Sequence, residues 1–159
     1  MNPDRLAVVA LGSNLGDSDA LLEAALERLR SLADGFFAAS TPIRSQPVDC
    51  PPGSPDFLNA VAAFEAAPQW QPRALLLQLQ AWERDFGRRP KQVHNEARPL
   101  DLDLIGFGPV VMQSPELTLP HPRAHLRAFV LAPLAEILPD LQLPGWTASA
   151  RDLLSRLNR

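Results

Sequence analysis

The order of periodic segments limits this chain to a small set of folds. Apolar runs of strand length lie at residues 6–11, 36–43, 57–64 and 100–105, and helical apolar repeats lie at residues 18–34 and 72–86. The order is therefore β, α, β, β, α, β, which is the split βαβ arrangement. It predicts an α+β fold whose sheet contains antiparallel strands and carries the core helices on one face.

The segment ends carry ordinary boundary signals. Pro72 suits the first position of the second helix, while Gly35 and Gly87 are expected to end the first and second helices. Further along we expect a hairpin return strand at 110–112, a helix at 124–138 and a short helix ending at residue 157. The C-terminal helices and the small β appendage predict a three-layer-like arrangement within one domain, residues 1–159.

Composition limits the partners of this chain. Its 159 residues have a net charge of −3, which gives no general attraction to nucleic acid or to an anionic membrane. The single cysteine, Cys50, excludes an internal disulfide and fits a reducing compartment. No apolar run approaches the roughly 20 residues needed to span a bilayer, and no leader pattern is present. We expect a cytoplasmic monomer that binds neither membrane nor nucleic acid.

Two acids share one face of the fourth predicted strand. Asp101 and Asp103 alternate with Leu100, Leu102 and Leu104, so the carboxylates point one way and the leucines the other. Like charges at this spacing repel unless a cation lies between them. The pair suits Mg²⁺ bridged to a polyphosphate. A half-solvated strand face would also tolerate it, and the spacing alone leaves both readings open.

A basic segment leads into this strand. It contains Arg88, Arg89, Lys91, His94 and Arg98. A charge run is usually a solvated surface, but cations that clamp phosphate and carboxylates that hold Mg²⁺ are the two halves of a phosphoryl-transfer site.

Three other polar features have both a structural and a functional interpretation. The turn at residues 12–17 could hold phosphate, but it lacks the lysine and spacing of a P-loop, so a structural turn is favoured. Asn59 lies among apolar residues, where its amide either bonds nearby backbone or reads a polar heterocycle. No cysteine lies near His121 in the sequence, so a zinc site is rejected.

Four motifs in order make the chain resemble a known family. They are Ala10–Asp17, Pro55–Ala60, Arg98–Ile105 and Leu119–Arg123 with Arg127–Leu131. Together they resemble 6-hydroxymethyl-7,8-dihydropterin pyrophosphokinase of folate biosynthesis. The resemblance implies a ferredoxin-like βαββαβ core and the transfer of pyrophosphate from ATP to the hydroxyl of 6-hydroxymethyl-7,8-dihydropterin, giving the pterin diphosphate and AMP. ATP would be the co-substrate, with two Mg²⁺ ions.

The resemblance also implies roles for particular residues. Asp101 and Asp103 would hold the metal and, with Arg88 and Arg98, form the catalytic set. Phe57 and Phe129 would sandwich the pterin and Asn59 would read its edge, within a pterin set of Ser45, Gln46, Val48, Phe57, Asn59 and Phe129. The ATP set would be Gln80, Glu83, Arg88, Arg98, Leu104, Thr118, His121 and Arg127.

The segment before the acids departs from the family's pattern. Residues 94–97 lack the tryptophan that many relatives carry, and Pro90 stands where an arginine is expected. This departure motivates an alternative, a diverged paralogue that binds pterin or nucleotide with little or no transfer. A third reading, a small-molecule or RNA-binding module without chemistry, is disfavoured because the acidic strand would repel a nucleic-acid backbone.

Overall fold

The computed structural model describes residues 1–46, 50–87 and 99–158. Its main sheet has the strand order β2-β4-β1-β5, and a short strand, β3, also pairs with β4. All of these pairings are antiparallel. The strands are β1 (Leu6–Ser13), β2 (Ala33–Ala39), β3 (Ile43–Ser45), β4 (Phe57–Ala66) and β5 (Asp101–Phe107).

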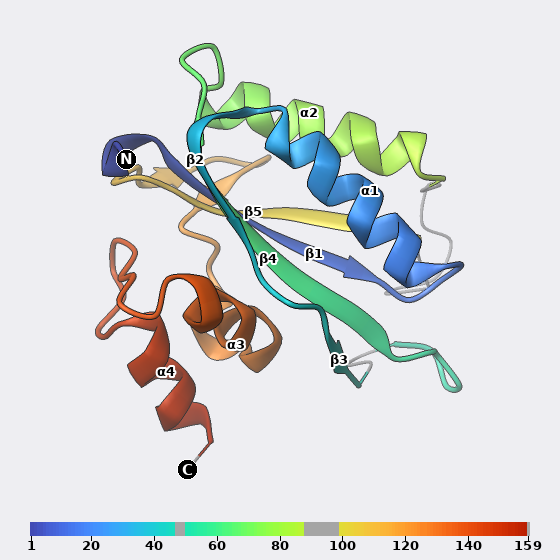
Figure 1. The fold of residues 1–159 in the computed structure, drawn as a ribbon. Helices are drawn as coiled ribbons and strands as arrows, with labels where there is room; N and C mark the ends of the chain where they lie inside the picture. Colours follow the sequence, from blue (N-terminus) through green and yellow to red (C-terminus); the bar gives the residue numbers. More distant parts are fainter. Residues whose placement is uncertain (47–49, 88–98, 159) are drawn as a thin grey trace.

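Helices cover both faces of this sheet (Figure 1). The helices α1 (Ser18–Arg30) and α2 (Pro72–Asp85) pack on one face, and α3 (Ala128–Ile137) and α4 (Ala150–Leu157) pack on the other. The expected α+β, ferredoxin-like core is confirmed, with its two core helices on one face and the C-terminal helices forming the third layer. Within the described residues, none of the helices has the length and apolar character needed to cross a bilayer.

The central strand, β1, is apolar on both faces because each face is covered. Ala7, Val9 and Leu11 belong to the core beneath α1 and α2, whereas Leu6 and Val8 belong to the core beneath α3 and α4. The same alternation applies to β5, where Leu102 and Leu104 join the first core. The carboxylates of Asp101 and Asp103 therefore lie on the α3 side of the sheet.

The second predicted strand is interrupted. The sequence predicts one strand over 36–43, but β2 ends at Ala39 and β3 begins at Ile43. Ala39 pairs with Ala62 and Ile43 with Asn59, so the segment between them has one residue more than β4 has opposite it.

Side chains provide hydrogen-bond acceptors for the backbone N–H groups at this break. Ser40 is buried, and its N–H donates to the Val61 carbonyl while its Oγ accepts from the Val61 N–H, both at 2.9 Å. The N–H of Thr41 donates to both carboxylate oxygens of Glu136 on α3, at 3.1 Å each, and its hydroxyl donates to Oε1 at 2.8 Å. The break is therefore stabilised by the hydrogen bonds of Ser40 to β4 and by the hydrogen bonds of Glu136 on α3 to Thr41.

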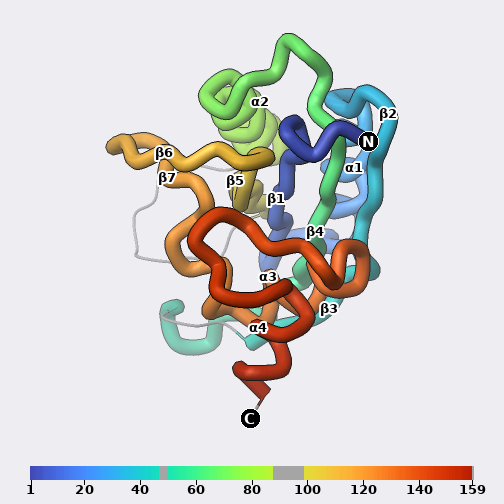
Figure 2. The backbone as a smooth tube through the Cα atoms, turned by 90° about the vertical axis from the view of Figure 1, so that its left-hand side faces the viewer, coloured from blue at the N-terminus to red at the C-terminus, as the bar shows by residue number. Residues whose placement is uncertain are grey.

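Three further boundaries differ from the sequence prediction. Gly35 does not end the first helix, because α1 stops at Arg30 and Gly35 lies within β2 with a φ of 99°. The helix predicted over 124–138 is divided by Arg127, whose extended backbone separates a short 3₁₀ helix, η2 (Ala124–Leu126), from α3. The predicted return strand is β6 (Met112–Gln113), which pairs with β7 (Thr118–Leu119) instead of β5 (Figure 2).

An N-terminal 3₁₀ helix, η1 (Pro3–Arg5), precedes β1.

Replacing Ser40 tests the account of the strand break. Ser40→Ala leaves the Val61 N–H buried without its acceptor, so we expect the free energy of unfolding to fall by about 1–3 kcal/mol. Denaturant unfolding at constant m-value measures the change. As a control, Ser31→Ala removes an exposed hydroxyl that donates to the Arg28 carbonyl and should change stability by under about 0.5 kcal/mol. Equal losses in the two variants would contradict the proposed role of the Ser40 hydroxyl.

Candidate functional site

Strand register brings the predicted pterin and metal residues onto one row. Gly12 of β1 is paired with Asn59 of β4 on one side and with Asp101 of β5 on the other. Two residues earlier on the same face, Ala10 is paired with Asp103. Asn59 and Asp101 thus face the same side of the sheet two strands apart, about 10 Å between backbones. In this row of paired residues, Gly12, which has no side chain, lies between them.

The amide of Asn59 has a fixed orientation. Asn59 is 5% exposed, and its Nδ2 donates to Ser45 Oγ at 2.7 Å and to the Ile43 carbonyl at 3.5 Å. Its Oδ1 lies 3.5 Å from the point where a Cβ on Gly12 would stand. Because the donors are engaged on the β3 side, the acceptor oxygen is presented over Gly12. A ligand that meets this oxygen needs an N–H or O–H donor.

Two aromatic rings accompany this acceptor. Phe57 precedes Asn59 by two residues on β4, so it shares the same face, and its Cδ1 lies 3.6 Å from the same point over Gly12. Phe129 lies in the first turn of α3, the helix that covers this face, and is half-buried against the core there. The guanidinium of Arg127 lies over the Phe129 ring, 5.5 Å from its centroid. Flat aromatic surfaces next to a single hydrogen-bonding group suit a planar heterocycle.

Hydrogen bonds with neighbouring segments fix the outer edge of β5, the strand that carries both acids. Glu83 of α2 accepts a hydrogen bond at 2.8 Å from the backbone N–H of Leu102, the residue between the two aspartates. Further along, the N–H of His121 donates to the Ile105 carbonyl at 2.8 Å. These bonds occupy backbone groups that an edge strand would otherwise leave open, and they hold the backbone that carries both carboxylates.

The surroundings of His121 favour the neutral form of its ring by lowering its pKa. Burial lowers its pKa below the ordinary value of 6.5, and the charges of Arg127 and Arg123 lower it further, while Asp101 acts in the opposite direction. Its Nδ1 accepts from the Arg123 N–H at 3.2 Å, so the proton of the neutral ring resides on Nε2. His121 therefore offers an N–H donor in the electrostatic surroundings of Arg127 and Asp101.

The donor set of Asp101 and Asp103 fits one kind of metal site. Across residues 1–46, 50–87 and 99–158, no three histidine, cysteine, aspartate or glutamate side chains gather to enclose an ion. Two carboxylates without a third ligand suit Mg²⁺, which usually keeps waters and shares its remaining positions with substrate phosphates. The same set does not suit a structural zinc ion, which needs four ligands.

The remaining predicted residues are distributed around this row. Gln46 is exposed after β3, Gln80 is exposed on α2, and Thr118 is half-buried in β7. Leu104 is 3% exposed in the core beneath α1 and α2, so its side chain does not line the face of the aspartates. Val48, Arg88, Arg98 and the rest of the basic segment lie outside the described residues.

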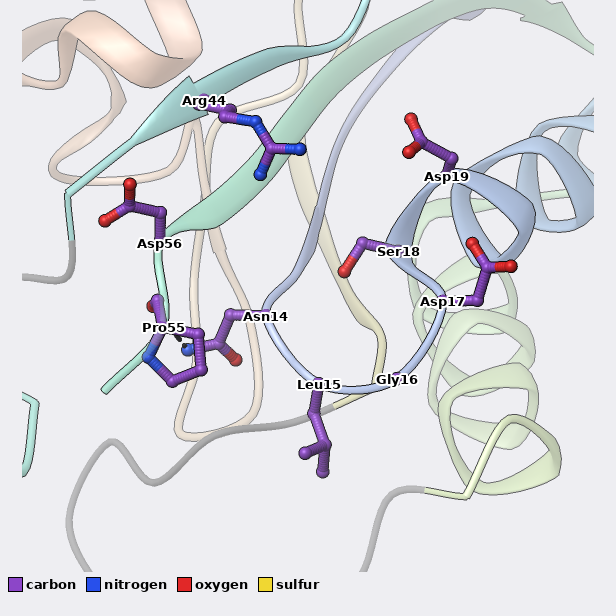
Figure 3. Close-up of a pocket in the computed structure, with 9 residues that line it drawn as sticks. All are labelled: Asn14, Leu15, Gly16, Asp17, Ser18, Asp19, Arg44, Pro55 and Asp56. Carbon is purple, nitrogen blue, oxygen red and sulfur yellow. Dashed lines mark hydrogen bonds between the residues drawn. The ribbon is translucent and has the colours of Figure 1, made fainter. Parts of the chain in front are cut away.

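A polar pocket of about 410 Å³ lies at the start of α1 (Figure 3). It is lined by Asn14, Leu15, Gly16, Asp17, Ser18, Asp19, Arg44, Pro55 and Asp56, none of which the sequence assigned to a site. Asp17 caps α1 by accepting from the Ala20 N–H at 3.2 Å, and the hydroxyls of Ser13 and Ser18 are 2.8 Å apart. These bonds support the structural reading of the turn. Three separate segments form the pocket, so no local signal could have predicted it.

Gly12 is the residue of the row that sequence reasoning missed. Its neighbours in the sequence predict a turn, yet it lies in β1, one residue before the strand ends. The sequence did contain one signal for Gly12, because a glycine that continues an apolar strand often marks close approach by another group. The register that gives it meaning depends on distant strands and cannot be read locally.

Comparison with known sequences places this geometry in context. The sequence model described as 7,8-dihydro-6-hydroxymethylpterin-pyrophosphokinase matches residues 8–139. A 2-amino-4-hydroxy-6-hydroxymethyldihydropteridine pyrophosphokinase of Pseudomonas aeruginosa is 39% identical over 136 residues, covering 86% of this chain and 82% of the relative. The enzyme of the same name from Haemophilus influenzae is 39% identical over 140 residues, covering 87% and 85%.

Solved structures agree on the fold. A crystal structure of HPPK-DHPS in complex with substrates has a TM-score of 0.75 at 11% identity, covering 98% of this chain. Plasmodium falciparum HPPK-DHPS has a TM-score of 0.70 at 13% identity, covering 96%. This chain spans 45% of each of those chains. At such identities the likeness concerns the fold alone.

These matches confirm the resemblance and the enzyme class that the four motifs predicted. No comparison supports the alternative of a diverged paralogue without transfer. The family match covers most of the chain, and the two bacterial relatives exceed one third identity over most of their own length. The chain belongs to the 7,8-dihydro-6-hydroxymethylpterin-pyrophosphokinase family of enzymes.

Proposed function

We propose that this pyrophosphokinase works at the face of the sheet that carries Asn59, Gly12 and Asp101. The reaction is transfer of pyrophosphate from ATP to the hydroxyl of 6-hydroxymethyl-7,8-dihydropterin, as in folate biosynthesis. The observation that carries the assignment is the register of three neighbouring strands, which sets an amide that suits a heterocycle beside a carboxylate that suits Mg²⁺. Residues 1–159 would act as a single domain.

The pterin side of the site follows from Asn59 and its neighbours. Asn59 Oδ1 would accept from an N–H at the edge of the pterin, while Ser45 Oγ keeps the amide from rotating. The rings of Phe57 and Phe129 would lie against the two faces of the heterocycle. Gln46 and Val48 complete the pterin set that the resemblance implies.

The ATP side follows from the acids and the groups near them. Asp101 and Asp103 would hold two Mg²⁺ ions, which when bound neutralise phosphate charge and orient the triphosphate. Arg127 and the Nε2–H of His121 would contact phosphate oxygens or the nucleotide, and Glu83 would keep the acidic strand in place. The resemblance assigns Arg88 and Arg98 to the phosphates, and Gln80, Leu104 and Thr118 to ATP.

The chemical step needs positioning more than reactive side chains. The pterin hydroxyl oxygen attacks the β-phosphorus of ATP, and the bond from that phosphorus to the oxygen bridging the α- and β-phosphates breaks. AMP leaves with that bridging oxygen, and the hydroxyl proton passes to solvent. No covalent intermediate with the protein is required, because the protein aligns the two substrates and neutralises charge.

We further propose that the enzyme acts in the cytoplasm as a monomer with small-molecule substrates only. The net charge of −3 and the single cysteine support this reading. Analytical sedimentation of the purified chain measures its oligomeric state, and a dimer at micromolar concentration would overturn the proposed monomer.

Release of AMP tests the proposed reaction directly. We expect AMP from ATP only when Mg²⁺ and the hydroxymethyl dihydropterin are both present. Asp101→Ala and Asp103→Ala should each lower kcat by roughly 10³-fold, because each removes an oxygen ligand of the metal. Asp140→Asn, an exposed acid paired with Arg151, is the control and should leave kcat unchanged. Normal turnover in either alanine variant would refute the metal assignment.

Substitution at Asn59 tests the pterin side. Asn59→Leu keeps the size of the side chain but removes the acceptor, so we expect pterin affinity to fall about 100-fold while ATP affinity stays the same. Ser45→Ala removes only the group that orients the amide and should cost less. Calorimetric titration of each variant with pterin and with an ATP analogue measures both affinities. A matching loss of ATP affinity in Asn59→Leu would argue against the assignment.

Titration of His121 tests the electrostatics near Asp101. In the ligand-free protein we expect an NMR pKa below 6.5, and Arg127→Gln should raise it because one of its causes is the Arg127 charge. The unfolded chain binds this proton at higher pH than the folded chain. The stability contribution is therefore fully present above pH 6.5 and is lost as pH falls through the lowered folded value. His121→Gln assigns the signal and should remove this pH dependence. A pKa above 6.5 in the unsubstituted protein would contradict the description.

A further inference from the structure

We infer that Gly12 determines which acceptor molecules this enzyme can use. The absence of a side chain at Gly12 keeps open the approach to Asn59 Oδ1, and any side chain there would obstruct a heterocyclic N–H that binds this oxygen. The inference rests on the proposed function, because it concerns the acceptor side of the same site. It assigns a specificity-determining role to a residue outside the pterin and ATP sets.

The geometry around Gly12 supports this role. A Cβ on Gly12 would stand 3.5 Å from Asn59 Oδ1, 3.6 Å from Phe57 Cδ1 and 4.0 Å from Asp101 Cβ. The position lies between the group that would read the pterin, the ring that would stack on it and a metal-binding acid. The acceptor substrate has to cross this position, because its ring meets Asn59 and its hydroxyl meets the triphosphate near Asp101.

The backbone does not require glycine at this position. Gly12 is paired on both sides within β1, and its φ lies outside the left-handed range occupied by Gly16 at 82° and Gly87 at 99°. Any L-residue can adopt such an extended conformation. Glycine within a strand also weakens the strand, so local stability would favour a different residue.

Packing against the described residues does not require glycine at this position either. The three distances from the hypothetical Cβ are those of ordinary van der Waals contact. Gly106 on β5 gives the contrast, because a Cβ there would stand only 2.8 Å from Leu143 Cδ1 and would displace that side chain. Packing thus explains Gly106, whereas neither the backbone nor the packing of residues 1–46, 50–87 and 99–158 explains Gly12. What remains is the space that the missing side chain leaves.

A methyl group at residue 12 would act on the substrate more than on the protein. A donor that binds Asn59 Oδ1 must come within 2.7–3.2 Å of it. A methyl carbon 3.5 Å from that oxygen occupies part of the approach and pushes the donor away. The enzyme therefore requires an acceptor whose hydrogen-bonding edge is flat and unsubstituted where it passes over Gly12.

Gly12→Ala and Gly12→Val test this inference, with AMP release as the assay and thermal unfolding as a check of the fold. We expect Gly12→Ala to lower kcat/KM for the pterin about tenfold or more, with a larger loss in Gly12→Val. The Tm of Gly12→Ala should be equal to or higher than that of the unsubstituted protein. KM for ATP should stay within about twofold. Ala39→Val adds similar bulk at an exposed position of β2 and should leave both substrates unaffected.

The outcomes separate this inference from the proposed function. If the unsubstituted protein releases AMP and Gly12→Ala keeps kcat/KM for the pterin within about twofold, Gly12 does not determine acceptor use. A fall in Tm together with equal losses for both substrates would make Gly12 a structural residue and would also overturn the inference. Absence of AMP release by the unsubstituted protein in the presence of pterin and Mg²⁺ would instead refute the proposed function.

Discussion

The antiparallel pairing of β1 with both β4 and β5 is the constraint on which the rest of the molecule depends. These backbone hydrogen bonds set Asn59, Gly12 and Asp101 side by side. A slip of one residue in either pairing would turn every side chain of the slipped strand to the opposite face. In β5 it would turn the two carboxylates toward the core beneath α1 and α2 and the leucines toward the α3 side of the sheet. Burial of Leu102, Leu104 and the apolar residues of β1 therefore protects the site as well as the fold.

Much of the fold could be predicted because local periodicity reports burial. The order of strands and helices follows from apolar spacing alone. The failures have specific causes in tertiary structure. Ser40 breaks a predicted strand because its hydroxyl replaces a backbone partner of Val61, and α3 begins only after Arg127 because the backbone of Arg127 is extended. Gly35 suggested a helix end that the first helix reaches earlier, at Arg30.

The candidate site was predictable in its chemistry and not in its assembly. The acids and Asn59 stand out in the sequence because like-charged pairs and buried polar groups need a partner, and the resemblance of four motifs to one family implies the aromatic residues. Gly12 carries no chemistry of its own, and its place between Asn59 and Asp101 depends on the register of strands far apart in the chain. The pocket around Arg44 was missed for the same reason, since it joins three segments.

The hydrogen bonds between Thr41 and Glu136 join two parts of the proposed pterin side that arise far apart in the chain. Glu136 lies near the end of α3, which begins beside Phe129, and Thr41 lies in the corner that leads into β3 and Ser45. A single carboxylate therefore anchors the helix bearing one aromatic wall to the strand that orients the amide. If thermal motion displaced α3, the corner at Thr41 would move with it. The distance between Phe129 on α3 and the β3 strand that orients Asn59 would then stay nearly constant, and with it the space proposed for the heterocycle.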